Sequence, residues 1–195
     1  MVGQSPAKIG VDAVILQDFI VHFHEYTELA GWSKVKLFVS CAEHDDLDVG
    51  VQIRKIDASG RPLSHMNYPV PVPIDQVKDM NVAKTLGPQG FIRASHAVSL
   101  DKSKSHGNDL FYTHHTREPV KPGSVVELDI PIWPIGMVFA EGEGIMLRVS
   151  GHDMCLPETE LTILTEPEDE NKGTHVVHTG GKYASCLTVP VIAPV

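Results

Sequence analysis

Apolar and polar residues alternate with a period of two in several short runs, and this pattern constrains the fold more than any other feature of the chain. Such alternation is typical of β-strands that bury one face and leave the other polar. Turn-forming residues bound the runs, for example at 57–60, 121–123 and 141–144. The alternating apolar sets are Phe19, Val21 and Phe23; Val35, Leu37, Val39 and Cys41; Val49, Val51 and Ile53; Val126, Leu128, Ile130 and Ile132; and Ile145, Leu147 and Val149.

Strands with one polar and one apolar face favour antiparallel sheets. The one segment that suits a helix is a short one near residues 74–86. We therefore predict an all-β jelly roll or β-sandwich of two antiparallel sheets, galactose-binding-like in architecture, with at most one or two short helices. We expect a lead-in over residues 1–16 and one domain over residues 17–195. Two long loops, 61–73 and the acidic 155–172, are expected to be functional or to form an interface.

The charge and composition exclude several classes of partner. A net charge of -9 and a pI near 5.6 argue against nucleic acid and anionic membranes, which require a clustered basic surface. No apolar run approaches the roughly 20 residues of a membrane-spanning helix, and the N-terminus does not have the pattern of a secretory signal. Three scattered cysteines are too few for a disulfide or zinc framework. We therefore expect a reduced, cytoplasmic protein without a cofactor.

Six segments of the chain occur in the order found in a known domain. They are 27–32, 44–57, 90–96, 116–129, 132–136, and the block His178-Thr-Gly-Gly-Lys-Tyr183 within the terminal stretch 171–192. Together, over roughly Phe19 to Val195, they resemble the C-terminal β-domain of the CocE/NonD and X-prolyl dipeptidyl-peptidase hydrolases. In that family, a separate α/β-hydrolase domain carries the catalytic triad.

The resemblance implies a stand-alone, non-catalytic β-domain that acts in binding or assembly. Its expected partner is a hydrolase catalytic domain or a second copy of itself. The resemblance also places the loop 150–154 toward the hydrolase interface, where this chain departs from the family's pattern. No nucleophile elbow is expected in this chain, because only two residues precede Gly3-Gln-Ser5 and Pro6 has no backbone N–H for an oxyanion hole.

An alternative hypothesis is a small repurposed enzyme of a biosynthetic pathway. Such an enzyme binds a hydrophobic metabolite and catalyses a cyclisation, dehydration or isomerisation by positioning and acid–base chemistry. We expect any small-molecule pocket near Trp133, the loop 151–154 and the turn 178–183. The catalytic candidates are His152, Asp153 and His96, and the binding candidates are Trp133, Met154, His178 and Tyr183.

Several of these residues also have a purely structural interpretation. His178 and Tyr183 flank a glycine pair that favours a structural turn. His96 is in strand phase with Ile92 and Val98, which indicates a half-buried histidine of a strand. The structural interpretation is the simpler one at each position.

A third hypothesis is a cupin-like metalloenzyme. His22, His24 and Glu28 have the His-x-His-x-x-x-Glu spacing of the first cupin metal motif, and a strand places both imidazoles on one face. The glycine pattern and a second motif with a third histidine are absent from the sequence. A polar strand face is the simpler interpretation.

Asp45, Asp46 and Asp48 suggest calcium at first sight. Calcium needs six or more oxygen ligands, usually from a glycine-containing loop, whereas this cluster leads into an apolar run. We interpret it as a turn and a hydrogen-bonded strand edge, with Asp46 and Asp48 on one strand face.

Overall fold

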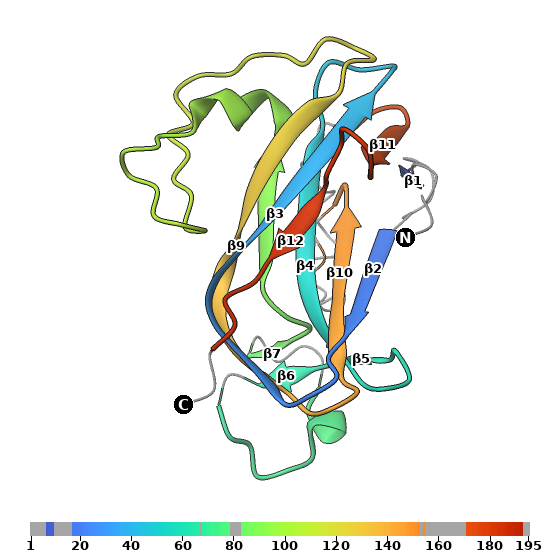
Figure 1. The fold of residues 1–195 in the computed structure, drawn as a ribbon, viewed down its shortest axis with the longest axis vertical. Helices are drawn as coiled ribbons and strands as arrows, with labels where there is room; N and C mark the ends of the chain where they lie inside the picture. Colours follow the sequence, from blue (N-terminus) through green and yellow to red (C-terminus); the bar gives the residue numbers. More distant parts are fainter. Residues whose placement is uncertain are drawn as a thin grey trace.

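The fold is built from two antiparallel five-stranded sheets that pack face to face (Figure 1). The structure is a computed structural model and describes residues 7–9, 17–66, 68–78, 83–152, 154 and 171–192. The prediction of an all-β sandwich with two antiparallel sheets is confirmed.

The first sheet, sheet A, is organised around the long strand β3 (Thr27–Cys41). Its order is β1 (Ala7–Ile9), β11 (His175–His178), β3 and β12 (Cys186–Thr188), and β9 (Val126–Phe139) pairs along the other edge of β3. Strand β1 belongs to the expected lead-in, so part of that segment joins the sheet, while the rest lies outside the described residues.

The second sheet, sheet B, has the order β2 (Gln17–His22), β10 (Gly144–Ser150), β4 (Asp48–Ile56) and β5 (Pro62–Leu63). Strand β8 (Gln89–Arg93) also pairs with β4. Below these strands in Figure 1, β6 (His65–Met66) and β7 (Lys84–Thr85) form a separate two-stranded sheet.

The core lies between the inner faces of the two sheets and matches the predicted alternation. Val35, Leu37, Val39 and Cys41 of β3 are buried. The alternating sets of β4, β9 and β10 pack against them in one cluster, with Val126 partly buried. Val21 differs, because it is 63% exposed. It lies on β2, the edge strand of sheet B, where the opposite sheet covers less of the surface.

The short helices differ in part from the prediction. The 3-10 turn η1 (Ile74–Gln76) lies in the segment expected to be helical, but that segment ends in strand β7. A second 3-10 helix, η2 (Ala94–Ser99), occupies residues whose pattern predicts a strand through His96, so the strand prediction is wrong beyond Arg93. No helix in the described part of the chain is long and apolar enough to cross a membrane.

A half-buried histidine in the small sheet is expected to make stability depend on pH. Burial, and next the nearby Lys55, lower the pKa of His65, and Glu143 opposes them only in part. The unfolded chain therefore binds the proton more readily, so the free energy of unfolding should fall as the pH drops below the ordinary histidine pKa of about 6.5.

Urea unfolding at pH 7.5 and pH 5.5 measures this dependence, and His65→Gln should reduce it. The same substitution at exposed His24 controls for the loss of a histidine. An unchanged pH dependence in His65→Gln would show that His65 is not its source.

Candidate functional site

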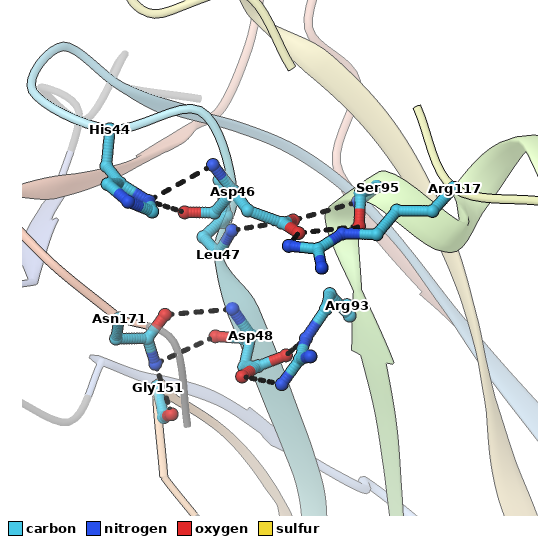
Figure 2. Close-up of polar contacts among 9 residues, drawn as sticks. All are labelled: His44, Asp46, Leu47, Asp48, Arg93, Ser95, Arg117, Gly151 and Asn171. Atoms are coloured by element: carbon cyan, nitrogen blue, oxygen red, sulfur yellow. Dashed lines mark hydrogen bonds and ion pairs between the residues drawn. The ribbon is translucent and has the colours of Figure 1, made fainter. Parts of the chain in front are cut away.

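A network of polar side chains lies where strand β4 begins (Figure 2). Residues 42–47 link β3 to β4, and Leu47 is buried in the core. Its burial fixes the link, so that the carboxylates of Asp46 and Asp48 reach different neighbours (Figure 2). The network joins segments that are far apart in the sequence.

Asp46 is the centre of the first half of this network. Its side chain is 1% exposed and accepts hydrogen bonds from the Leu47 N–H at 3.0 Å and the Ser95 N–H at 2.9 Å. The Ser95 hydroxyl donates at 2.5 Å and Arg117 Nη2 at 3.0 Å. Burial by itself raises the pKa of Asp46, but the hydrogen bonds from Ser95, Leu47 and Arg117 outweigh it and hold the pKa below the ordinary aspartate value.

Asp48 is the centre of the second half. Arg93, its neighbour on β8, donates from Nε to Oδ1 at 2.8 Å and from Nη2 to Oδ2 at 2.9 Å, which is the two-pronged geometry that guanidinium and carboxylate favour. The Asp48 N–H donates to Asn171 Oδ1 at 2.8 Å. Asn171 Nδ2 in turn donates to the carbonyl oxygens of Asp48 at 3.3 Å and Gly151 at 2.5 Å. Asn171 therefore ties the start of β4 to the residue after β10.

The chemistry available to this network is structural. A nucleophilic serine needs a base beside it and access to the substrate. Ser95 is fully buried, and its hydroxyl donates to Asp46, whose carboxylate also receives three N–H donors. Further bonds extend the network, because the Ala94 N–H donates to Leu47 O and the Glu118 N–H to Ser95 O. The arrangement holds the loops at this end of the sandwich in one geometry.

Part of this site was predictable from the sequence. Asp45 lies in a bend and Asp46 in the irregular link before β4. The prediction that Asp46 and Asp48 share a strand face is wrong, because β4 begins only at Asp48 and Asp46 turns toward η2. Arg117 and Asn171 were missed, and no local spacing marks them. Arg93 and Ser95 lie in segment 90–96, Arg117 in segment 116–129 and Asn171 in the stretch 171–192, all of which carried part of the family resemblance.

The turn 178–183 lies on the outer face of sheet A and has the geometry that its glycines favour. Gly180 and Gly181 have φ of 79° and 56°, and the Tyr183 N–H donates to Gly180 O at 3.0 Å. His178 Nε2 lies 2.8 Å from the Ser40 hydroxyl, and its ring lies 5.1 Å from that of Tyr183. Burial lowers the pKa of His178, which favours the neutral imidazole in this contact.

The family model described as the X-Pro dipeptidyl-peptidase C-terminal non-catalytic domain matches residues 15–188. The chain belongs to this family. The fold is therefore that of a non-catalytic β-domain of this family, and the expected resemblance is confirmed.

Several solved structures also resemble this domain. A CocE/NonD family hydrolase from Staphylococcus aureus is 28% identical, with a TM-score of 0.77, over 96% of this chain and 33% of that one. A second structure of a CocE/NonD family hydrolase from this organism is 24% identical, with a TM-score of 0.73, over 99% of this chain and 37% of that one.

An aminopeptidase from a Thaumarchaeota archaeon shares the fold at 17% identity and a TM-score of 0.57, over 91% of this chain and 26% of that one. No curated protein matches the chain. The chain thus spans about a third of the length of the hydrolases that it matches.

The domain places the remaining binding candidates on different elements. Trp133 is exposed on β9, next to a bulge opposite residues 31–33 of β3, whereas His178 pairs with Phe38. Five residues of β3 separate Ser33 from Phe38, which is about 17 Å at 3.3 Å per residue. Met154 is buried. A pocket that joins Trp133, the loop 151–154 and the turn 178–183 stays a prediction.

The catalytic candidates are also separated by element. His152 lies in the bend after β10, and its N–H donates to the Ser150 hydroxyl at 3.0 Å. His96 lies on η2, with Nδ1 3.1 Å from Thr116 O and its ring 5.2 Å from that of His114. Asp153 lies outside the described residues.

The three metal candidates have other contacts. His22 ends β2, with Nδ1 2.9 Å from Gly142 O, and His24 lies in the following bend. Glu28 accepts the Tyr26 hydroxyl at 2.5 Å. Within the described ranges, no three histidine, cysteine, aspartate or glutamate side chains gather where they could hold a metal ion. The cupin-like hypothesis therefore gains no ligand set from these residues.

Proposed function

We propose that this chain acts as the non-catalytic β-domain of a CocE/NonD or X-prolyl dipeptidyl-peptidase-like hydrolase, by binding and assembling with a hydrolase catalytic domain. The family match carries the proposal, because it covers residues 15–188 of this chain and names a non-catalytic domain. The match to only a third of an S. aureus hydrolase supports it, since the remainder of that chain lies outside the matched part. The proposal keeps the cytoplasmic location expected from the sequence.

The carboxylates at the start of β4 support a role in assembly rather than catalysis. Asp46 is buried and accepts from Arg117 and from backbone N–H groups, the half-buried Asp48 carboxylate accepts from Arg93, and Ser95 is buried. The positions of His96 and His152 do not support the alternative enzyme hypothesis, because the two residues lie on different elements and each has its own contacts.

An apolar patch on the outer face of sheet A supports a partner surface. Val138 and Ile192 lie on opposite sides of Glu28 of β3, and both are exposed. Two residues further along, exposed Ala30 pairs with Gly136, and the space that a Cβ would take at Gly136 has no atom within 4 Å. We call these four residues, Ala30, Gly136, Val138 and Ile192, the sheet A patch. Glu28 lies between Val138 and Ile192, so the patch combines exposed apolar side chains with one carboxylate, and exposed apolar groups gathered on one face mark interaction sites.

A chimera tests the proposal. We expect that an S. aureus CocE/NonD hydrolase whose C-terminal third is replaced by this chain keeps hydrolysis of a p-nitrophenyl ester, while the pure chain shows none. Val138→Asp should lower the activity of the chimera at least about tenfold, because a buried, unpaired carboxylate at an interface costs several kcal/mol.

Val98→Asp on η2 is the matched control, since Val98 is 50% exposed and Val138 is 49% exposed. It should leave the activity of the chimera unchanged. Equal effects of the two substitutions would reject the sheet A patch as the partner surface. Hydrolysis by the pure chain that a serine-directed inhibitor abolishes would contradict the non-catalytic role.

A further inference from the structure

The free edge of sheet B is a six-residue strand without irregularity. Strand β2 pairs with β10 and with no other strand of the described chain. The register runs without a shift from Gly144 opposite His22 to Val149 opposite Gln17. Figure 1 shows β2 as the outermost strand beside β10. An edge of this kind presents its outward backbone groups to another strand.

The hairpin contacts show which backbone groups point outward. Just beyond β2, the Phe23 N–H donates to Glu143 O at 2.8 Å, and Phe23 O accepts from the Gly142 N–H at 2.9 Å, so the backbone of Phe23 faces the strand β10 side. Backbone direction alternates along an antiparallel strand. Phe19 and Val21 therefore bond toward β10, whereas the N–H and C=O groups of the even-numbered residues, Asp18, Ile20 and His22, point away from the sheet.

Strand β9, which is a long edge strand of sheet A, carries features that oppose pairing. Strand β9 contains Pro131 and Pro134 and a bulge, and its Pro131 carbonyl lies against Gly90 of β8. Prolines and bulges protect sheet edges. Strand β2, with the sequence Gln-Asp-Phe-Ile-Val-His, has no proline, lysine or bulge.

Apolar side chains on both faces of β2 are exposed. Ile20 is 48% exposed on the outer face, and Val21 is 63% exposed on the inner face. A further strand added at this edge would cover part of both side chains. A strand that pairs here must place its own backbone N–H and C=O groups opposite those of Asp18, Ile20 and His22.

We propose that β2 pairs antiparallel with β2 of a second copy of this chain, around a two-fold axis at Ile20. This places Ile20 opposite Ile20 of the second copy, and Asp18 opposite His22. Each of the three residues then lies opposite a residue of the second copy whose backbone groups also point outward. Each such pair exchanges two N–H···O hydrogen bonds. The pairing is isologous, as a two-fold dimer requires.

The side chains fit the same register. Val21 lies opposite Phe19 of the second copy, which covers its exposed face. Asp18, which already binds Arg148 at 2.7 Å through both carboxylate oxygens, faces an imidazole rather than a second carboxylate. The two sheets B become one continuous sheet, by the strand addition that many complexes use. The pairing uses sheet B, so it does not depend on the proposed contact of the sheet A patch with a hydrolase.

Sedimentation velocity tests the pairing. Over roughly 10–500 µM, a range suited to an interface below about 1,200 Å², the mass should rise from 21.3 kDa toward twice that value. Ile20→Lys should weaken association at least about tenfold, because it places like charges directly opposite each other. Val98→Lys removes an equally exposed apolar residue from η2 and should leave association unchanged. A monomer at every concentration, or equal effects of the two substitutions, would overturn the proposal.

A cross-link fixes the register independently of any effect on folding. Ile20→Cys, in a background with Cys155→Ser and Cys186→Ser, should oxidise to a disulfide-linked dimer joined through position 20, since directly opposite residues bring their Cα atoms to about 5.5 Å. Phe91 of β8, which is 48% exposed, is the control position, and Phe91→Cys should form no such dimer. Equal cross-linking at both positions would indicate random collision and would overturn the pairing.

Discussion

Asp46→Ala is expected to lower the free energy of unfolding by about 2–4 kcal/mol, since each buried donor left without its acceptor costs about 1–3 kcal/mol. Asp46 receives donors from Leu47, Ser95 and Arg117, and its side chain is only 1% exposed. Removal of the carboxylate leaves the Ser95 N–H and hydroxyl buried without their acceptor, and unsatisfied buried donors carry their full desolvation cost. The loss should also loosen η2, because Ser95 belongs to that turn.

Urea unfolding followed by tryptophan fluorescence measures the change. Asp45→Ala is the matched control, because Asp45 is the preceding residue and its 55% exposed carboxylate lies 3.7 Å from His44 Nδ1. Its loss should change the free energy of unfolding by less than about 0.5 kcal/mol, as for most surface substitutions. If the two alanine variants unfold at the same urea concentration, the network does not hold this end of the sandwich together.

Gly90→Ala is expected to cost about 3 kcal/mol, at the upper end of the range for overpacking. A Cβ at position 90 would lie 2.0 Å from Pro131 O and 3.3 Å from Ile130 Cγ2. The first contact is with backbone, which has no rotamer by which to move aside. Strand β8 of sheet B meets β9 of sheet A at this position, so relief of the clash requires the two sheets to separate there.

Gly136→Ala on β9 is the control for this substitution, because no atom lies within 4 Å of its Cβ position. It should leave the melting temperature within a few degrees of the parent, since it adds no clash. Equal destabilisation by the two alanines would mean that general glycine effects, rather than the approach of β8 to β9, explain the loss at Gly90.

The core was predictable because its pattern is local. Successive side chains of a strand point to opposite faces. The burial of Val35, Leu37 and Val39 can therefore be predicted from a single run of the sequence. The same reasoning placed Leu128 and Ile130 in the core. The glycine pair at 180–181 likewise marks its turn, because glycine adopts positive φ without the steric cost of a side chain.

The polar site was not predictable in the same way, because its partners are distant in the sequence. Arg117 is 71 residues from Asp46, and Asn171 is 123 residues from Asp48. Only the packing of the two sheets brings these groups together. The end of β8 shows the same limit: residues 94–99 continue the strand pattern, but Asp46 accepts the Ser95 N–H across 49 residues, and the chain turns into η2.

The sequence by itself therefore determined the strands, the face that each one buries, the all-β sandwich and, through motifs in order, the family. Only the tertiary structure decided that Asp46 is buried, that η2 replaces a strand, and that β2 is left as an unprotected edge with Val21 exposed. The physical reason is the distance along the sequence over which each effect acts. Periodicity and turn propensity depend on neighbouring residues, whereas burial of a charge and exposure of an edge depend on contacts with distant segments.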